Sequence, residues 1–457
     1  MSRLLIVFAL LVSATALSMT PPTLSLKARP LVTRPTQASA RRTRPLVAMD
    51  FPLETIATVD FPLDTIGTTA AVGVGVLLVI VLAAGRGSFA AGAALMLVFL
   101  GGDPDERDAS GANDNRALKD FALSVTPSAW KKAYLGDNDV ERSDGEPALL
   151  DLPAWQGEEA RTLVEPEAVA CIRQMRLEPI ETSSLGPVDT CFLSLQPSGR
   201  PAADAPPVLL IHGFDSSLLE FRYITDALTQ AGLSVEACEW WTGGFTDRLP
   251  FEKAVTEDGA KPWDLVREHL YAFWKRQLGD QKVTLVGFSL GGAVAIDFAA
   301  SHPECVDRLV LVDAGGESYA QPAPFLTSLA ADPVTNLFQW RATNGLLPYP
   351  HVWSKEAGWR QSLQAYLRSG GYQVRVNPEL IKTVPQPTVV FWGEEDDVLP
   401  VEDAYKFERD LPNCVGVKII PDAQHAPALE NPAVVAEEII AFATSKSVTQ
   451  QPKTAVA

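Results

Sequence analysis

Cysteine and histidine are both scarce in this 457-residue sequence, with five residues of each. The cysteines are widely spaced, and none belongs to a CxxC pair or lies near a cluster of histidines. This spacing argues against a zinc site and against a disulfide framework. We therefore predict no metal site, and we expect five buried free thiols in a reducing compartment: Cys171, Cys191, Cys238, Cys305 and Cys414.

Clusters of lysine and arginine are absent from the C-terminal two-thirds of the chain, and the formal net charge is −18. Binding to phosphate backbones needs such clusters, so nucleic acid is excluded as a partner. Hydrophobic residues make up 47% of the sequence and charged residues 21%, which is typical of a globular protein. The length allows a large buried core and more than one domain.

Acidic residues are missing from residues 1–49, which contain seven basic ones. A basic start, an apolar run over residues 4–12 and the small-x-small site Ala14-Thr15-Ala16 have the layout of a signal peptide. The rest of this stretch is rich in Arg, Thr, Ser and Pro, like a transit peptide. Signal followed by transit resembles the two-part plastid presequence of algae with secondary plastids and predicts delivery to a plastid. Simple secretion, or a signal anchor in a secretory-pathway membrane, is the alternative.

Two uncharged runs follow, within residues 50–102. Residues 65–85 are long enough to cross a hydrocarbon core of ~30 Å as a helix, whereas residues 87–102 are short for a full span. They predict membrane association, and a pair of buried helices in a soluble protein is the alternative. Residues 103–169 have the acidic, polar composition of a linker. We expect a disordered tail over residues 446–457.

Short apolar runs alternate with helical stretches over residues 170–445. This rhythm predicts an α/β domain with a doubly wound, mostly parallel sheet of eight strands. The interval 317–384, between the sixth and seventh strands, is too long for a loop and predicts a helical cap. Its aromatic residues either line a pocket or form the core of the cap. The strands are expected at 172–178, 190–195, 208–211, 234–238, 283–286, 309–312, 388–392 and 417–420. Helices are expected at 218–230, 263–277, 292–300 and 401–411.

The string "GFSLGG" at residues 287–292 stands between a predicted strand and a predicted helix. It matches the G-x-S-x-G pattern, in which a sharp strand-to-helix turn displays a serine hydroxyl above the sheet. Glycines are required there because the turn crowds the positions two residues on either side of the serine. A serine that merely caps the helix is the alternative. The context favours Ser289 as a nucleophile.

A serine nucleophile needs a base, and His425 is the best placed of the five histidines. It follows the last predicted strand in "PDAQHAPALENP", at the carboxyl edge of the sheet where Ser289 is expected. His212 is better explained by shaping the turn after its strand, and His302 by capping a helix end. His269 is expected at the surface of a helix, and His351 lies in the predicted cap.

A carboxylate between the serine and the histidine should complete the site, in the order Ser, Asp, His. The stretch "VVFWGEEDDVLP" offers Glu394, Glu395, Asp396 and Asp397 after the seventh strand. Asp313, after the sixth strand, is the alternative location. The residues alone leave this choice open.

Residues 205–443 resemble the α/β-hydrolase family through four motifs: "HGFDSS" at 212–217, "GFSLGG" at 287–292, "WGEEDDVLP" at 392–400 and "QHAPALENP" at 424–432. They are most similar to plastid and cyanobacterial members with a HGFDSS-type loop. The resemblance implies that Asp396 is the acid. It also implies an oxyanion hole made by the backbone N–H groups of Phe214 and Leu290, and no metal or organic cofactor.

Two segments depart from the family pattern. In the loop after the fourth predicted strand, Glu239 and two tryptophans stand where relatives usually place Asp and Gly-x-Gly. Next to His425, Gln424 stands where Gly is usual. We expect a serine hydrolase that cleaves an apolar, lipid-like ester, with the residues that bind the substrate unspecified. A carbon–carbon hydrolase or lyase of the same fold is an alternative. A ligand receptor or scaffold with little turnover is another.

Overall fold

The computed structural model describes residues 150–445, apart from residues 203, 318–330, 332–334, 336–338 and 340–350. The predicted presequence, both apolar runs, most of the linker and the C-terminal tail lie outside the described residues and stay predictions. Over the part of the chain that is described, no helix combines the length and the apolar character needed to span a bilayer.

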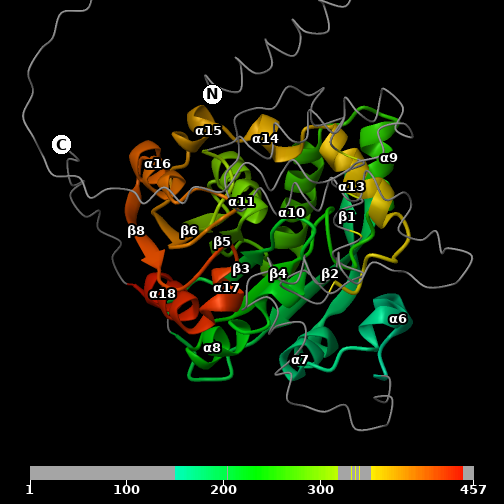
Figure 1. Cartoon of the computed structure of the whole chain (residues 1–457), viewed down its shortest axis with the longest axis horizontal. Coiled ribbons are helices and arrows are strands. Elements are labelled where there is room, and N and C mark those ends of the chain that lie inside the picture. The colour runs from blue at the N-terminus through cyan, green and yellow to red at the C-terminus, as the bar shows by residue number, and fades with distance from the viewer. Residues whose placement is uncertain are drawn as a thin grey trace, which may run out of the picture. The chain divides into compact units, whose positions relative to one another are not determined.

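One sheet of eight strands organises these residues (Figure 1). The strands are β1 (Arg176–Thr182), β2 (Gly186–Leu195), β3 (Val208–Ile211), β4 (Val235–Cys238), β5 (Val283–Phe288), β6 (Val306–Val312), β7 (Thr388–Gly393) and β8 (Cys414–Ile420). They lie in the order β1-β2-β4-β3-β5-β6-β7-β8. The β1–β2 and β2–β4 pairs are antiparallel, and the other pairs are parallel. The predicted mostly parallel sheet is therefore confirmed.

Helices cover both faces of the sheet, as Figure 1 shows. In chain order they are η3 (Ala154–Gln156), α6 (Gly157–Ala160), α7 (Pro166–Gln174), η4 (Leu218–Phe221), α8 (Thr225–Gln230), α9 (Leu249–Thr256), α10 (Pro262–Leu278), α11 (Leu290–Ser301), α13 (Trp359–Arg368), α14 (Gly371–Arg375), α15 (Pro378–Ile381), α16 (Glu402–Asp410), α17 (Pro427–Glu430) and α18 (Pro432–Thr444). The side chains of α10 and α11 belong to one core, and those of α8 and α18 belong to the other.

The central strands are continuous apolar runs because each strand serves both cores. Leu209 and Ile211 of β3 pack into the core under α10 and α11, whereas Val208 and Leu210 pack into the core under α8 and α18. All four are at most 1% exposed. Successive side chains of a strand point to opposite faces, so a polar residue on either face would be buried.

The amino-terminal boundary of the domain differs from the prediction. Residues 172–174 belong to α7 rather than to the first strand, and β1 extends to Thr182. Ala168, Cys171 and Ile172 are buried at helical spacing, and short apolar runs of this kind fit a helix or a strand equally well. Leu152 and Ala160 also join the core, so part of the predicted linker packs against the domain.

The described part of the interval between β6 and β7 contains helices. α13, α14 and α15 lie within the predicted cap at 317–384, and α13 contacts α9 (Figure 1). Trp353, Trp359, Tyr366 and Tyr372 are all at most 4% exposed. These four aromatic side chains therefore belong to the packed interior and do not line an open pocket.

All five cysteines are free and buried, as predicted. Burial raises the pKa of the Cys171 thiol to about 12 and that of the Cys191 thiol well above its usual value. Both shifts favour the protonated, unreactive form of these two thiols at neutral pH.

Candidate active site

Ser289 occupies the sharp turn between β5 and α11. Its φ of +50° and ψ of −121° are rare for a residue with a side chain, and such strain concentrates at functional sites. A Cβ on Gly287 would lie 2.4 Å from the carbonyl oxygen of Gly291, and a Cβ on Gly291 would lie 2.3 Å from that of Ile211. The glycines are therefore needed for the turn to close against β3.

The structure brings Ser289, His425 and Asp396 together from three loops at the carboxyl ends of parallel strands. The Ser289 Oγ lies 2.8 Å from Nε2 of His425. On the other side of the ring, Nδ1 lies 2.9 Å from Oδ2 of Asp396. The Asp396 side chain is fully buried, whereas that of His425 is 15% exposed. The imidazole of His425 is therefore hydrogen-bonded to the serine hydroxyl on one side and to the aspartate carboxylate on the other.

Two backbone amides hold Asp396 in place. Its Oδ1 accepts hydrogen bonds from the N–H groups of Val398 at 2.8 Å and Leu399 at 2.9 Å. This leaves Oδ2 for the imidazole. Because both amides belong to the "DDVLP" turn, the local sequence sets the orientation of the carboxylate.

The charge around His425 favours its protonated form. Burial opposes that form, but the hydrogen bond and charge of Asp396 outweigh it and raise the pKa of His425 to about 9. Burial also raises the pKa of the Glu220 carboxyl, which lies near the same ring.

Asp313, the alternative acid, lies behind this arrangement rather than in it. Its Oδ1 accepts a hydrogen bond from the Gly393 N–H at 2.7 Å. Burial, followed by the nearby charge of Asp396, raises the pKa of Asp313 well above its usual value. Both effects favour the neutral form of the side chain, which supports the end of β7.

Of the two predicted oxyanion residues, Leu290 directly follows Ser289, and Phe214 belongs to a loop that passes beside it. Leu290 is the first residue of α11, where backbone N–H groups have no partner within the helix. Phe214 follows Gly213, and a Cβ on that glycine would lie 3.2 Å from the Cβ of Ser289. The loop after β3 thus passes directly against the serine.

Three carboxylates that the sequence did not single out shape the loops of the site. Glu220 accepts a hydrogen bond from the Gly213 N–H at 3.0 Å, and Glu430 accepts one from the Gln424 N–H at 2.6 Å. Asp215 accepts several bonds from the segment that begins at residue 351. The positions of Asp215 inside the "HGFDSS" motif and of Glu430 inside the "QHAPALENP" motif could have drawn attention to these two residues.

The departure at Glu239 is explained by the loop after β4. Its carboxylate accepts bonds from the N–H groups of Phe245 at 2.6 Å and Thr246 at 3.2 Å. Burial raises its pKa to about 7. The adjacent Trp240 donates from Nε1 to the carbonyl oxygen of His212 at 3.0 Å, so Glu239 and Trp240 build loop structure beside the site.

The other histidines have structural contacts. His212 bonds to the carbonyl oxygen of Gly213 at 2.8 Å, which agrees with a turn-shaping role. His302 ends α11 and stacks on Tyr271. The prediction for His269 is wrong: this residue is fully buried and bonds to Thr190 at 2.7 Å, because α10 turns that face toward the sheet.

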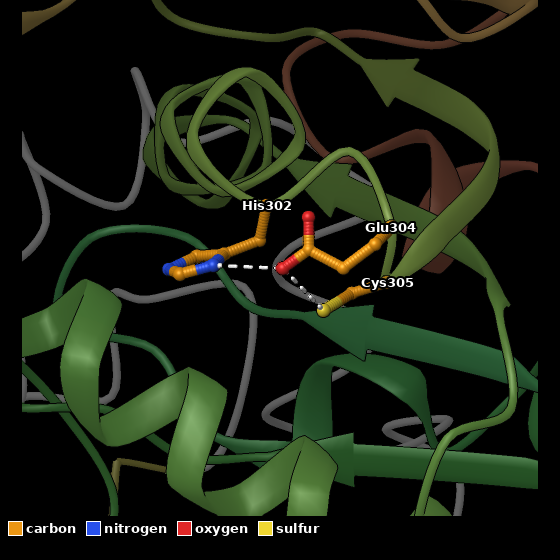
Figure 2. A group of neighbouring side chains, drawn as sticks. All are labelled: His302, Glu304 and Cys305. Carbon is orange, nitrogen blue, oxygen red and sulfur yellow. Dashed lines mark hydrogen bonds and ion pairs between the residues drawn. The ribbon is translucent and has the colours of Figure 1, made fainter.

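Two groups of described residues place three metal-ligand atoms within 4.8 Å of one another. One contains Asp313, Asp396 and His425. The other is drawn in Figure 2, where Glu304 faces both His302 and Cys305. Burial raises the pKa of the Cys305 thiol to about 12, so its sulfur is protonated and poorly suited to bind metal. The hydrogen bonds drawn in Figure 2 hold this turn together.

Residues 208–438, about half of the chain, match the model of the alpha/beta hydrolase family. The sheet order, the nucleophile turn and this match agree, and the chain belongs to the α/β-hydrolase family. The prediction drawn from the four motifs is confirmed at this level.

Curated relatives extend the comparison. Over 268 residues the chain is 33% identical to the alpha/beta hydrolase domain-containing protein VTE7 of Arabidopsis thaliana, a match that covers 53% of this chain and 76% of the relative. It is 28% identical to 2-hydroxy-6-oxo-6-(2'-aminophenyl)hexa-2,4-dienoic acid hydrolase of Metapseudomonas resinovorans, over 44% of this chain and 73% of the relative. It is 27% identical to sn-1-specific diacylglycerol lipase ABHD11 of Danio rerio, over 52% of this chain and 78% of the relative.

Proposed function

We propose that this chain is a serine hydrolase that cleaves an ester through an acyl-enzyme. The observation that carries the proposal is the hydrogen-bond chain from Ser289 through His425 to Asp396. A hydroxyl is a weak nucleophile, and an adjacent base that is oriented by a carboxylate is the arrangement that activates it.

In the proposed mechanism, the Ser289 Oγ attacks the ester carbonyl carbon while His425 takes the hydroxyl proton. The N–H groups of Phe214 and Leu290 hold the resulting oxyanion, and each such donor contributes about 3 kcal/mol to transition-state stabilisation. His425 then gives its proton to the departing alcohol. Water attacks the acyl-enzyme by the same route in reverse, with Asp396 stabilising the imidazolium at both stages. No step calls for a metal or an organic cofactor.

The proposed substrate is a small apolar ester, such as a lipid acyl ester. The lipase among the relatives and the apolar runs at residues 65–85 and 87–102 support this choice. We also propose delivery to a plastid through residues 1–49, with the secretory-pathway membrane as the alternative. The plant origin of one relative agrees with a plastid.

A carbon–carbon hydrolase is the second candidate. The relative from Metapseudomonas resinovorans, whose name describes a dienoic acid hydrolase, favours it. Enzymes of that class use the same three side chains, so the geometry around Ser289 supports both reactions. A receptor with little turnover would also keep the fold.

The test compares the wild-type chain with Ser289→Ala on p-nitrophenyl esters of short and long acyl chains and on a 2-hydroxy-6-oxo-dienoate. If the wild-type chain hydrolyses the esters and Ser289→Ala does not, the esterase proposal is supported. If the wild-type chain turns over only the dienoate, the carbon–carbon hydrolase is supported. A fluorophosphonate probe labels only an activated serine. Failure of the wild-type chain to label or to turn over either substrate would leave the receptor as the better description.

The localisation proposal has its own test. A fluorescent protein fused behind residues 1–49 should enter the plastids of an alga with secondary plastids. A fusion that contains only residues 1–18 should stop in the secretory pathway. Equal distribution of the two fusions would contradict the transit role of residues 19–49.

A further inference from the structure

Asp215 is a fully buried carboxylate that holds the loop after β3 to the segment leading into α13. Its Oδ1 accepts hydrogen bonds from the indole N–H of Trp359 at 2.7 Å and of Trp353 at 3.3 Å. Its Oδ2 lies 2.9 Å from Nε2 of His351. The three donors are at most 5% exposed. One side chain of the sheet domain thus collects three donors from the interval between β6 and β7.

The position of Asp215 in the chain links this contact to Ser289. It directly follows Phe214, the residue whose backbone N–H is proposed to bind the oxyanion. Its φ of +49° lies in the left-handed region, which aspartate and asparagine tolerate better than most residues. On the other side of Phe214, the Gly213 N–H is bound by Glu220 at 3.0 Å. The Phe214 amide therefore lies between two anchored residues.

We propose that Asp215 is a positioning residue that sets the direction of the Phe214 N–H by fixing the loop to His351, Trp353 and Trp359. The inference rests on the proposed serine hydrolase function. Oxyanion donors act through distance and angle, and a displacement of about 1 Å in a catalytic group can cost roughly 100-fold in rate. In this role Asp215 acts through the backbone of the loop and through its contacts with His351, Trp353 and Trp359.

The segment between β6 and β7 has a second attachment, which serves as a control. Arg375 of α14 binds Asp297 of α11, with its Nε 2.7 Å from the Oδ1. Asp297 is fully buried and also binds Arg267 at 2.9 Å. This contact holds the same interval to the domain but does not involve the loop that carries Phe214. Loss of either contact loosens the segment, whereas only loss of the Asp215 contact releases the oxyanion loop.

The experiment compares Asp215→Asn with Arg375→Gln on the best p-nitrophenyl ester, and active sites are titrated so that kcat refers to folded enzyme. Asparagine keeps the backbone conformation and most of the shape, but it loses the charge and turns an NH2 group toward the buried donors. We expect kcat to fall about 10- to 100-fold in Asp215→Asn, with KM within about threefold of wild type. Arg375→Gln should lower Tm and keep kcat within about twofold.

A second pair of variants keeps the inference testable if Asp215→Asn does not fold. Trp359→Phe removes the donor at 2.7 Å, and Trp353→Phe removes the one at 3.3 Å from the same oxygen. Kcat should fall more in Trp359→Phe. Asp204→Asn, at an exposed aspartate with φ of +68°, controls for the backbone conformation and should match wild type.

The outcomes separate the inference from the proposed function. A wild-type chain that turns over no ester contradicts the function itself. An active wild-type chain whose kcat per titrated site is unchanged in Asp215→Asn or Trp359→Phe overturns only the positioning role. Equal losses of kcat in Asp215→Asn and Arg375→Gln would also overturn it, because attachment of the segment in general would then be the cause.

Discussion

The Oδ1 of Asp313 accepts a hydrogen bond from the backbone N–H of Gly393 at 2.7 Å, across the neighbouring ends of β6 and β7. Gly393 is the last residue of β7, three positions before Asp396. A carboxyl that follows the sixth strand therefore supports the turn from which the acid after the seventh strand reaches His425. Both candidate acids therefore belong to the same arrangement: Asp396 contacts His425, and Asp313 supports the strand end that precedes Asp396.

Asp396→Asn and Asp313→Asn should differ strongly in ester turnover. Asn at 396 cannot stabilise the imidazolium, and the corresponding change in a serine protease lowers kcat on the order of 10⁴-fold. Asn at 313 keeps an oxygen for the Gly393 N–H and replaces a carboxyl whose neutral form is favoured by burial, so kcat should stay within about threefold. Steady-state kinetics of both variants is the measurement. A comparable loss in Asp313→Asn would show that this residue shares the role of the acid.

The rate should rise with pH through the titration of His425. The ring must be neutral to accept the Ser289 proton, and Asp396 raises the pKa of the ring above its ordinary 6.5, to about 9. The midpoint of kcat/KM should therefore fall between 6.5 and about 9. Asp396→Asn should move this midpoint down. The Ser289→Ala variant corrects for alkaline hydrolysis of the ester, and a midpoint below 6.5 would contradict the charge balance described for the ring.

Gly291→Ala should unfold the nucleophile turn, whereas Gly416→Ala should be tolerated. The added methyl at 291 would lie 2.3 Å from the carbonyl oxygen of Ile211 and 2.5 Å from that of His212, and neither backbone group can move freely. Overpacking of this kind costs about 3 kcal/mol. A methyl at 416 meets nothing within 4 Å, so the change should stay within about 0.5 kcal/mol. Urea unfolding measures the free energy of unfolding of both variants, and equal values for the two would refute the steric argument.

The free energy of unfolding of Glu236→Gln, relative to that of wild type, should increase as pH rises. Glu236 is 4% exposed on β4 and accepts a bond from the Ser194 hydroxyl at 2.7 Å. Burial raises its pKa from 4.5 to about 7, so the folded state binds a proton that the unfolded state releases. The wild-type free energy of unfolding therefore loses this contribution as pH rises from 4.5 through about 7. Glutamine does not titrate, so the variant avoids that loss.

Urea unfolding at pH 5 and pH 8 measures the effect. The stability of Glu236→Gln minus that of wild type should increase between the two pH values. Glu257→Gln, at an exposed position of the chain, provides the matched control. A stability difference that does not change with pH would mean that folding does not raise the pKa of Glu236.

Much of the site could be predicted from the sequence because its parts are local. The signals for the strand before Ser289, for the glycine turn around it and for the helix after it all lie within a few residues of one another. His425 could be chosen because the chain offers few histidines and only one after the last strand. Asp396 was resolved from its neighbours by family resemblance, since several carboxylates share that loop.

Other features could not be predicted because they depend on which faces meet. His269 sits on a helix whose inner face is set by packing against the sheet, and a single histidine gives no sign of that direction. Asp215 looked like part of a loop motif, and its three donors come from residues more than 130 positions away. The first strand was misplaced because a short apolar run has no intrinsic preference for helix or strand.

By itself the sequence predicted the alternation of strands and helices and the sharp turn at Ser289, because both are encoded in short-range patterns of apolar residues and glycines. The order Ser289, Asp396, His425 followed from the family resemblance of the motifs. The tertiary structure alone decided that Asp396 Oδ2 lies 2.9 Å from the imidazole, that Asp313 supports the end of β7, and that Asp215 binds donors of the interval between β6 and β7. These contacts join segments that are far apart in the chain. The role of each carboxylate therefore depends on which hydrogen-bond donors the fold packs against it.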